Sequence, residues 1–439
     1  MRDGVVERLV SGLEQEPSVS IRLNPAFGLH PEIPGAEPVP WCNGGWYLAE
    51  RPVFTADPLF HAGTYYVQEA SSMFIDHVVR TLAAITDRPF RRCLDLCAAP
   101  GGKTTLLRSV VPQDCLLISN EPIRARAQVL AENVAKWGQP NMLVSQAYPA
   151  DFAPFVNIFD LILADVPCSG EGMMRKEAEA VAQWSKALVA DCAARQRSII
   201  SDIWPTLRPG GFLIYSTCTF NHEEDEDNVE WIARELGGEV IAIPTEPEWN
   251  IDGDLRSEDS LRPEDSLCPE DSIRPEDSIR LEDSTHSAGS LPCCHFLPGT
   301  ARGEGFFCAA IRKNGNEDSV IINNEDSIII NNVREASRSK KDKRSRGEIK
   351  LTDRLNLLPT DQLDSPGAPS VELSLEDAFR YLRGESLVLE PSVPRGIVQV
   401  CYRGRRLGLM KNIGNRANNL YPKAWRIHST HIQPKTILG

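Results

Sequence analysis

The stretch CLDLCAAPGGKTT, residues 93–105, decides the fold of this 439-residue chain. A short apolar strand leads into a loop of small residues and glycines, and we expect a helix to begin at about Thr104. Glycine lets the backbone approach a ligand closely, and a helix N-terminus favours acceptor or anionic groups. The ending Gly-Lys-Thr is similar to a phosphate-binding Walker A loop, but Cys97 stands where that loop requires its first glycine. The G-x-G-x-x-G spacing of dinucleotide folds is absent as well.

Apolar runs that predict strands alternate with helical segments after this loop. Strands are expected near 93–97, 116–120, 142–145, 159–164, 211–216 and 306–312. Helices are expected near 104–109, 123–137, 191–206 and 225–236. This alternation predicts a doubly wound α/β fold with a parallel sheet.

Two of the twelve cysteines follow predicted strands. Cys168 comes after the run 159–164, and Cys218 comes after the run 211–215. Since ligands bind at the carboxyl ends of the strands in open α/β sheets, we expect both thiols at that edge, where they suggest covalent catalysis. Most free cysteines instead behave as small buried hydrophobes. That structural role is expected for Cys93, Cys115, Cys192 and Cys401.

Glu121 ends the next predicted strand, about twenty residues after the glycine loop. A Rossmann-type fold places an acid there that binds the ribose hydroxyls of a nucleoside cofactor. The alternative is an exposed glutamate that caps the helix 123–137, because acids favour the first turn of a helix. Together with the glycine loop, the position of Glu121 favours the ribose role.

Longer stretches around these motifs resemble the RNA cytosine-C5 methyltransferases that use S-adenosylmethionine, close to the bacterial 16S ribosomal RNA members of that family. The similar stretches are SIRLNP, AGTYYVQEASSMF, DLCAAPGGKTT, NEPIRARAQVLAENVAKWG, FDLILADVPCSGEGMMRK, LRPGGFLIYSTCTFNHEEDEDNV, GEGFFCAAIRK and LGLMKNIGNRANNLYPKAWRI. They cover roughly residues 15–250, 295–313 and 370–428. The resemblance implies a Rossmann-like methyltransferase domain, an N-terminal accessory lobe and a small β-rich PUA-like C-terminal domain.

The resemblance also implies how the two thiols divide the reaction. Carbon 5 of cytosine is a poor nucleophile, and a thiolate that adds to carbon 6 makes carbon 5 reactive toward a methyl sulfonium. By resemblance Cys218 is the nucleophile and Cys168 assists product release, whereas a DNA cytosine methyltransferase would use the earlier Pro-Cys motif. Asp165 would hydrogen-bond the cytosine amino group and stabilise the polarised ring, or else hold the Pro167 turn as a structural carboxylate.

For S-adenosylmethionine, the resemblance implies a site made of the glycine loop and the ends of neighbouring strands. Many relatives carry an acid near the adenine, but residues 144–148 contain no carboxylate, so Gln146 is expected to make that contact. Lys103 would orient the loop or lower a thiolate pKa. The expected set is Cys97, Ala98, Ala99, Pro100, Gly101, Gly102, Lys103, Glu121, Gln146 and Asp165.

The acidic residues of the chain, whose net charge is −14, are concentrated in one repetitive segment. Residues 252–284 hold twelve acids and four arginines, a net charge of −8, in a six-residue repeat that includes PEDSLC and PEDSIR. Residues 316–331 add the pair NEDSVIIN and NEDSIIIN. Such polar repeats cannot bury enough apolar surface to fold alone, so we expect insertions, with a short solenoid as the alternative.

Positive charge gathers near the C-terminus. Residues 403–426 contain seven cations and no acid, and aromatic residues interleave with the cations. Charges that contact the backbone and surfaces that stack on bases are typical of RNA recognition. The expected RNA-binding residues are Arg405, Arg406, Lys411, Arg416, Tyr421 and Trp425. Residues 334–346 are also basic and either contact RNA phosphates or form a solvated linker.

Four regions are therefore expected. They are an accessory RNA-positioning lobe over 1–90, a methyltransferase domain over 91–313 with an acidic insertion at 252–290, a linker over 314–350 and a PUA-like RNA-binding domain over 351–439. We expect no membrane segment and no secretory leader, because no apolar run has the required length. Cysteines without regular spacing suit a reducing cytoplasm. Cys293-Cys294-His295 is too compressed for a zinc site, and no metal is expected.

The predicted function is methylation of carbon 5 of a cytosine in RNA, with 16S ribosomal RNA as the expected substrate and a monomeric cytoplasmic enzyme. Alternatives are a transfer RNA cytosine-C5 methyltransferase, a catalytically silent RNA-binding relative, and a small-molecule or protein methyltransferase on the same fold. The presence of Cys218, Cys168 and Asp165 argues against the silent relative. A small-molecule enzyme would need neither two thiols at one edge nor a basic, aromatic C-terminal region.

Overall fold

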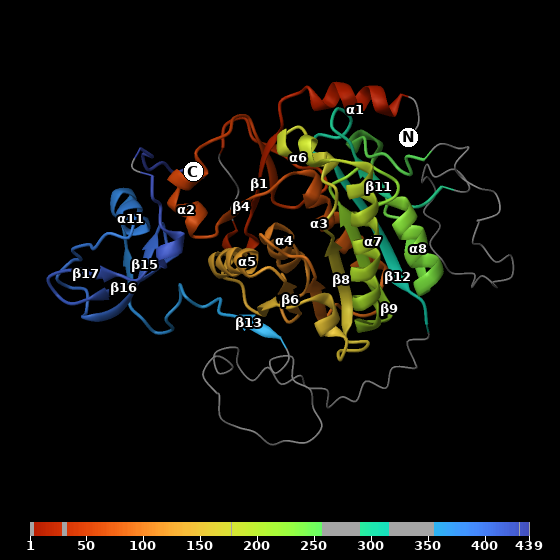
Figure 1. Cartoon of the computed structure of the whole chain (residues 1–439). Coiled ribbons are helices and arrows are strands. Elements are labelled where there is room, and N and C mark those ends of the chain that lie inside the picture. Colours follow the sequence, from red (N-terminus) through yellow and green to blue (C-terminus); the bar gives the residue numbers. More distant parts are fainter. Residues whose placement is uncertain are drawn as a thin grey trace, which may run out of the picture. The chain divides into compact units, whose positions relative to one another are not determined.

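The computed structural model describes residues 4–28, 33–176, 178–256, 290–315, 355–429 and 431–438, and Figure 1 traces them along the chain. The chain divides into two units. The first comprises Met1–Ser18, Ala84–Thr86 and Phe155–Val320, and the second comprises Val19–Ala83, Asp87–Pro154 and Ile321–Gly439. Both predicted repeat segments, except for residues 252–256, and the basic segment 334–346 lie outside the described residues.

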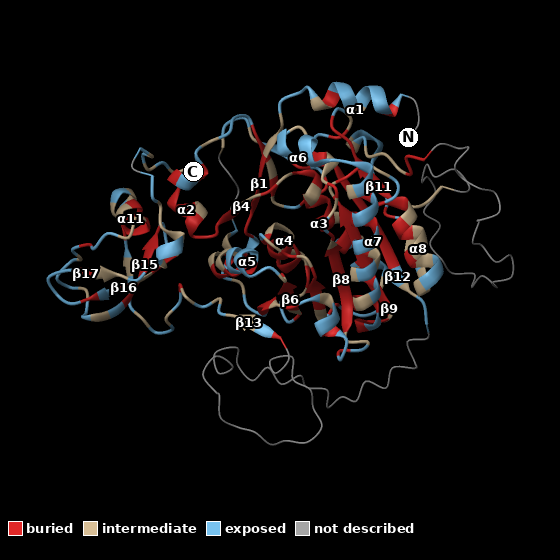
Figure 2. Cartoon of the chain, viewed as in Figure 1, coloured by how far each residue is buried: buried red, intermediate tan, exposed pale blue. Residues whose placement is uncertain are grey.

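The first unit is built on strands in the order β10-β12-β9-β8, with β11 paired to β12. These strands are β8 (Phe159–Asp165), β9 (Leu207–Thr217), β10 (Gly238–Ile241), β11 (Cys294–Phe296) and β12 (Phe306–Lys313). The helices are α1 (Val5–Leu13), α6 (Ala178–Gln183), α7 (Lys186–Ile203) and α8 (Glu226–Leu236). Helices α7 and α8 cover one face of the strands in Figure 1, and Figure 2 shows β8 and β9 buried along most of their length. Their burial explains why their sequences are nearly continuous apolar runs.

Strands β8 and β9 are parallel, and their register places Asp165 beside Ser216. The two carboxyl ends therefore lie at one edge, as predicted. Strand β12 runs antiparallel to β9, so the prediction of a parallel sheet is wrong for this last strand. The reason is the short connection from β11, which pairs with β12 as an antiparallel hairpin and so reverses the chain.

The second unit contains the strands that follow the glycine loop. Its parallel strands are β5 (Arg92–Asp95), β6 (Leu116–Asn120) and β7 (Met142–Gln146), and β13 (Asn356–Leu358) pairs antiparallel with β7. Helices α4 (Gly102–Val110) and α5 (Arg124–Trp137) connect these strands, and α3 (Ile75–Ile85) precedes them. Strand, helix and strand alternate as the sequence predicted, which is the Rossmann-like pattern.

Two smaller sheets complete the second unit. The N-terminal one has the order β2-β3-β1-β4 and the C-terminal one the order β14-β15-β16-β17. Their elements are β1 (Val19–Leu23), β2 (Glu37–Pro38), β3 (Gly45–Leu48), α2 (Pro58–His61), β4 (Tyr65–Val67), β14 (Ser370–Glu372), α11 (Leu375–Leu382), β15 (Gly396–Tyr402), β16 (Arg405–Asn412) and β17 (Ala417–Asn419). One hydrophobic core joins Ile21 and Tyr65 of the first sheet to Val398 and Leu407 of the second. The C-terminal module is thus packed on the N-terminal strands within this unit.

A buried carboxylate reinforces that packing. Asp57 is fully buried and accepts hydrogen bonds from the Tyr65 hydroxyl at 3.1 Å and from the backbone N–H of Ile437 at 3.0 Å. Burial raises the pKa of Asp57 above its ordinary value, and these hydrogen bonds act in the opposite direction. The end of the chain is therefore held to the N-terminal strands by a polar contact as well as by apolar burial.

Two helices begin at least two residues before their predicted starts. Helix α7 begins at Lys186 rather than near 191, because the Ser185 hydroxyl accepts a hydrogen bond from the Leu188 N–H and caps it. Helix α4 begins at Gly102 rather than at Thr104. Its N-cap, Gly101, has a φ of 116°, a left-handed conformation that glycine adopts without a steric penalty.

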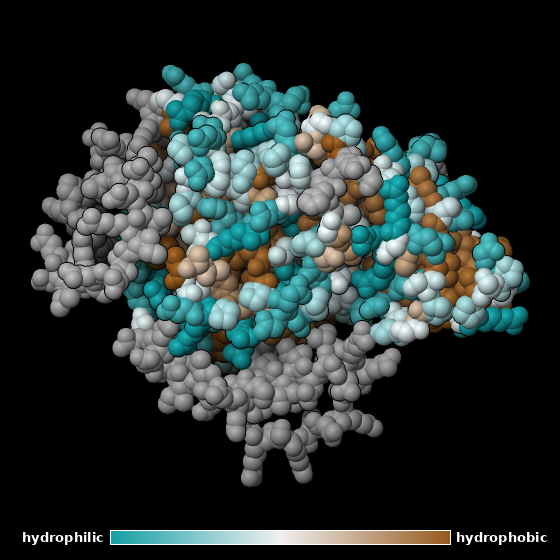
Figure 3. Space-filling model, turned by 180° about the vertical axis from the view of Figure 1, so that it is seen from behind, coloured by the Kyte–Doolittle hydropathy of each residue, from teal (hydrophilic) through white to brown (hydrophobic). Residues whose placement is uncertain are grey.

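Among the described residues, no helix is both long enough and apolar enough to cross a membrane. Figure 3 shows the face opposite to that of Figure 1, where hydrophilic side chains predominate and apolar ones are confined to smaller areas. Scattered apolar patches of this kind are normal on protein surfaces.

Candidate active site

The two predicted thiols meet at the ends of β8 and β9. Cys168 follows β8 by three residues and Cys218 follows β9 directly, and their Sγ atoms are 3.1 Å apart. The backbone N–H of Cys218 also lies 3.4 Å from the Cys168 sulfur. Both residues are free cysteines and are partly exposed, unlike most cysteines of the chain. The structure confirms that the two thiols lie together at one strand edge.

The two thiols are not equivalent. The pKa of the Cys168 thiol is raised well above its ordinary value, first by its hydrogen bond to Cys218 and then by burial and by the charge of Cys218. Two thiolates at this distance would repel each other, so the pair carries at most one negative charge near neutral pH. Cys168 therefore holds its proton more tightly than an ordinary thiol.

Glu224 holds the loop of Cys168 in place. This carboxylate is fully buried and accepts hydrogen bonds from the Ser169 backbone N–H at 3.1 Å, from Gln196 Nε2 at 2.7 Å and from Asn221 Nδ2 at 2.8 Å. Nothing in the sequence distinguishes Glu224, because acids in a charged run such as HEEDED are usually solvated. Its neighbour Glu223 is of the solvated kind, with a side chain 51% exposed.

A second carboxylate, that of Glu171, follows Cys168 in the sequence and holds the loop of Cys218 in place. Glu171 accepts hydrogen bonds from the Thr219 hydroxyl at 2.7 Å and from the Phe220 N–H at 2.8 Å. Gly172 N–H donates to the carbonyl of Cys218 at 2.8 Å, and a Cβ at Gly172 would lie 2.9 Å from that oxygen. Glycine is required for this approach, and the two cysteine loops support each other.

Asp165, the third predicted catalytic residue, is the last residue of β8 and is partly exposed. Its Oδ1 accepts a hydrogen bond from the Ser216 hydroxyl at 2.8 Å. This bond fixes the orientation of the carboxylate beside the strand that leads to Cys218. The structure therefore brings Asp165 and both thiols to the same edge.

The cysteines expected to be structural are buried. Cys93 and Cys115 are fully buried, Cys192 is 3% exposed and Cys401 is 9% exposed. Burial raises the pKa of Cys192 and of Cys401, so these thiols are protonated and unreactive near neutral pH. The burial expected for these four cysteines is confirmed, whereas the reactivity of Cys168 and Cys218 stays a prediction.

The glycine loop from Cys97 to Lys103 follows β5 and continues into the first turn of α4 in the second unit. The Ala98 N–H donates to the carbonyl of Asn120 at 2.8 Å, and the Asn133 side chain donates to the carbonyl of Pro100 at 2.8 Å. A Cβ added to Gly102 would lie 3.3 Å from the ring of Tyr66. The loop is thus held by the end of β6 and by α5, with little room for larger residues.

Glu121 is 1% exposed at the end of β6, not exposed as in the capping alternative. Its Oε1 nevertheless accepts a hydrogen bond from the Ile123 N–H at 2.9 Å, so it does stabilise the start of the following turn. Its Oε2 lies 3.3 Å from Arg126, whose guanidinium also donates to the carbonyl of Ala99 in the glycine loop. The ribose role of Glu121 stays a prediction.

Gln146, the predicted adenine contact, is the last residue of β7. Its Nε2 donates to the carbonyl of Pro122 at 3.3 Å, and its Oε1 accepts from Asn356 Nδ2 at 3.1 Å. Both ends of the amide have partners inside the protein. Its contact with a cofactor stays a prediction.

Two of the predicted RNA-binding arginines contact the protein itself. The guanidinium of Arg405 stacks 4.4 Å from the ring centroid of Phe27 and donates to the carbonyl of that residue. Arg406 donates to the carbonyl of Ala135 at the end of α5, at 3.1 Å. Lys411 on β16 and Arg416 after it are exposed. Lys411 and Arg416 are therefore better placed to contact RNA phosphates than Arg405 and Arg406.

Tyr421 cannot stack on a base in this structure, and its place in the predicted RNA-binding set is wrong. It is 1% exposed and belongs to the hydrophobic core of the second unit. Its ring contacts Tyr381 and Trp425, with centroids 5.3 and 6.1 Å away. Trp425 is half-buried, and the Lys136 ammonium lies 5.8 Å from its ring. Tyr421 lies among cations in the sequence, yet its ring is packed in the hydrophobic core, where aromatic side chains bury a large apolar area.

Three family models match the chain. The model described as 16S rRNA methyltransferase RsmB/F matches residues 83–312. The model described as the N-terminal domain of 16S rRNA methyltransferase RsmF matches residues 1–70, and that of the methyltransferase RsmF PUA domain matches residues 368–427. The three matches follow one another in the order that the resemblance implied.

Curated relatives named ribosomal RNA small subunit methyltransferase F are similar to most of the chain. The protein of Erwinia tasmaniensis is 28% identical, with 88% of this chain and 84% of the relative covered. That of Escherichia fergusonii is 31% identical, with the same shares covered. A solved structure described as the crystal structure of PH0851 is 21% identical with a TM-score of 0.54, over 71% of this chain and 63% of that chain. The last similarity concerns the fold alone.

Proposed function

Because the chain belongs to the 16S rRNA methyltransferase RsmB/F family, we propose that it methylates carbon 5 of a cytosine in 16S ribosomal RNA. It is an S-adenosylmethionine-dependent methyltransferase with a Rossmann-like fold, an RsmF-type N-terminal domain and a PUA-like C-terminal domain. The observation that carries the proposal for carbon 5 is the pair of thiols 3.1 Å apart at one strand edge. Methylation at carbon 5 requires one group that adds to carbon 6 and a second group nearby that assists release of the adduct, and the two thiols can supply both.

The chemistry assigns a different task to each thiol. The Cys218 thiolate adds to carbon 6 of cytosine, and the electron pair displaced onto carbon 5 forms the bond to the incoming methyl group. The proton on carbon 5 must then leave before the Cys218–C6 bond can break. Once Cys218 is bonded to carbon 6 it carries no charge, so the neighbouring Cys168 can lose its own proton to solvent and accept the proton from carbon 5, which assists this release. Asp165 would accept a hydrogen bond from the cytosine amino group and stabilise the charge that develops on the ring.

The residues of the glycine loop fit a nucleoside cofactor. Gly101 and Gly102 allow backbone approach at the start of α4, and the buried Glu121 supplies a carboxylate at the end of the next strand. S-adenosylmethionine bound there supplies the methyl group. In this proposal the loop from Cys97 to Lys103 holds the cofactor, Glu121 binds its ribose and Gln146 lies near its adenine.

The decisive experiment compares Cys218→Ala with Cys168→Ala. Cys218→Ala should abolish methyl transfer and form no covalent RNA complex, since no thiolate can reach carbon 6. Cys168→Ala should still attack but release slowly, so a complex stable in denaturing gels should accumulate. Cys192→Ala, which removes a buried thiol of α7, is the matched control and should turn over normally. Accumulation of the complex in the Cys218 variant would reverse the two roles.

The substrate is tested separately, with purified 16S ribosomal RNA, small ribosomal subunits and transfer RNA. Transfer of a labelled methyl group to the first two, with 5-methylcytosine as the product, is the expected result. If transfer RNA alone were labelled, the substrate would be transfer RNA and not ribosomal RNA. A labelled product other than 5-methylcytosine would refute the proposed position of methylation.

A further inference from the structure

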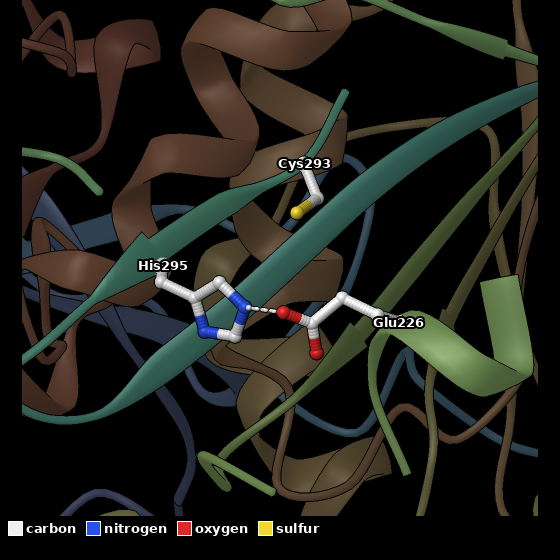
Figure 4. Close-up of side chains that lie close together, drawn as sticks. All are labelled: Glu226, Cys293 and His295. Carbon is white, nitrogen blue, oxygen red and sulfur yellow. Dashed lines mark hydrogen bonds and ion pairs between the residues drawn. The ribbon is translucent and has the colours of Figure 1, made fainter. Parts of the chain in front are cut away.

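A carboxylate, a thiol and an imidazole from two segments of the first unit lie together beside the sheet. They belong to Glu226, Cys293 and His295, and one ligand atom from each lies within 4.8 Å of the other two. Figure 4 shows the carboxylate and the imidazole facing each other, with the thiol pointing toward them. All three residues are buried. None of them has a part in the chemistry described above.

The local structure explains why these three side chains meet. Cys293 directly precedes β11 (Cys294–Phe296), and side chains alternate between faces along an extended chain, so Cys293 and His295 share one face and Cys294 points to the other. Glu226 is the first residue of α8. The sequence CCH alone offers only two suitably oriented ligands, and the third comes from a residue about seventy positions earlier. Linear spacing therefore could not reveal the group.

The hydrogen bonds within the group leave two polar atoms unused. His295 Nε2 lies 3.1 Å from Glu226 Oε1, which also accepts the Leu255 N–H at 2.9 Å. Glu226 Oε2 and His295 Nδ1 are buried, and neither has a hydrogen-bond partner within the described part of the chain. Buried polar atoms in folded proteins almost always have a partner. Two of the three residues therefore have unused capacity to bind a ligand.

We propose that Glu226, Cys293 and His295 bind one divalent transition metal ion, with Zn²⁺ as the best fit. Thiolate and imidazole ligands favour zinc over magnesium or calcium. One carboxylate, one thiolate and one Zn²⁺ have a formal charge of zero, which suits a buried position. Ligand atoms around tetrahedral zinc are about 3.3–3.7 Å apart. Binding therefore requires the three ligand atoms to move closer together, and the Cys293 thiol releases its proton to solvent.

The position of the group indicates a structural role. Residue 252 forms an isolated antiparallel bridge with His295, and Asp254 Oδ2 accepts the Leu291 N–H at 3.1 Å. These contacts hold residues 252–256 next to residues 291–295, which lie on either side of residues 257–289 in the sequence. An ion bound by Glu226, Cys293 and His295 would fasten that junction to α8. The metal would thereby keep β11 in place whatever the length of the inserted segment.

The test uses the full chain with both site thiols replaced (Cys168→Ala and Cys218→Ala), so that they cannot bind the probe. After treatment with a chelator, this protein is titrated with Co²⁺ and its absorption is recorded. We expect one ion per chain and a sulfur-to-cobalt charge-transfer band. Cys293→Ser should remove the band, whereas Cys294→Ser, its buried neighbour on the opposite face, should keep it.

A second measurement does not depend on cobalt spectra. The parent protein is the chain with Cys168→Ala and Cys218→Ala. Chelation should lower the melting temperature of this protein and of its Cys294→Ser variant, and should leave that of its Cys293→Ser variant unchanged. Glu226→Gln and His295→Gln should each weaken Co²⁺ binding at least tenfold. An absent band in the parent protein, or an equal band in Cys293→Ser, would overturn the proposal. Neither result bears on methyl transfer, so the two proposals can fail separately.

Discussion

Replacement of Glu224 by glutamine tests whether this carboxylate positions the Cys168 loop. In the structure its two oxygens accept hydrogen bonds from Ser169 N–H, Gln196 Nε2 and Asn221 Nδ2. Glutamine puts an NH₂ group in place of one oxygen, so at least one donor faces another donor. The neighbouring amides cannot simply flip, because Gln196 Oε1 accepts the Tyr215 hydroxyl and Asn221 Oδ1 accepts the Glu224 N–H.

The size of the effect follows from these contacts. A hydrogen bond to a charged group contributes about 1.5–3 kcal/mol, and a buried donor left without a partner costs about 1–3 kcal/mol. We therefore expect Glu224→Gln to lower the free energy of unfolding by about 2–4 kcal/mol. Glu223→Gln, at the adjacent position with a side chain 51% exposed, is the matched control and should change it by less than about 0.5 kcal/mol.

Two assays separate positioning from stability. Urea unfolding measures the free energy, and methyl transfer to RNA, measured well below the melting temperature, gives kcat and KM. If Glu224 positions Cys168, kcat should fall and covalent RNA complexes should accumulate in Glu224→Gln, while the KM for S-adenosylmethionine stays constant because the glycine loop follows other strands. Equal stability and equal kcat in the Glu224 and Glu223 variants would refute the reasoning.

Three further predictions concern other parts of the chain. Arg405→Glu should lower the melting temperature, because it breaks the stacking of Arg405 on Phe27. The exposed Lys411 is the comparison: Lys411→Glu should leave the melting temperature unchanged and reduce the log–log salt slope of RNA binding by about 0.7–0.9. A reduced salt slope with an unchanged melting temperature in Arg405→Glu would restore Arg405 to the RNA-binding set. Deleting residues 257–289 with a short Gly/Ser bridge should preserve cooperative unfolding and turnover, since loop length costs little closure entropy, and loss of the cooperative transition would make the repeats part of the core. Burial, and then the charge of Lys136, lower the pKa of His61 to about 3, from 6.5 when unfolded. Stability from this group is complete above pH 6.5 and decreases as the pH falls, by about 2 kcal/mol between pH 7 and pH 5, and His61→Gln should remove that part of the pH dependence in urea titrations.

The sequence was sufficient wherever the signal was local and periodic. The strand, glycine loop and helix around residues 93–105 were predictable because apolar runs and glycines determine backbone conformation over a few residues. The meeting of Cys168 and Cys218 was also predictable. Both follow buried parallel strands, and parallel strands present their carboxyl ends at one edge of a sheet.

Burial was less predictable, because it depends on which segments pack together. Tyr421 lies among cations in the sequence and was expected at the surface, yet its ring fills the core under α11. Glu224 lies in a run of acids and was overlooked, yet it is fully buried while Glu223 is exposed. Adjacent residues of one type can differ in this way because a helix or loop turns each side chain toward a different neighbour.

Only the tertiary structure decided which distant groups share a site. Glu226 stands at the start of α8, and His295 lies on a strand beyond the acidic repeats, yet their side chains are 3.1 Å apart. The direction of β12 likewise depends on its hairpin with β11 rather than on any local pattern. Local sequence determines the conformation of each segment, while contacts between segments depend on how the buried faces of many elements fit together at once.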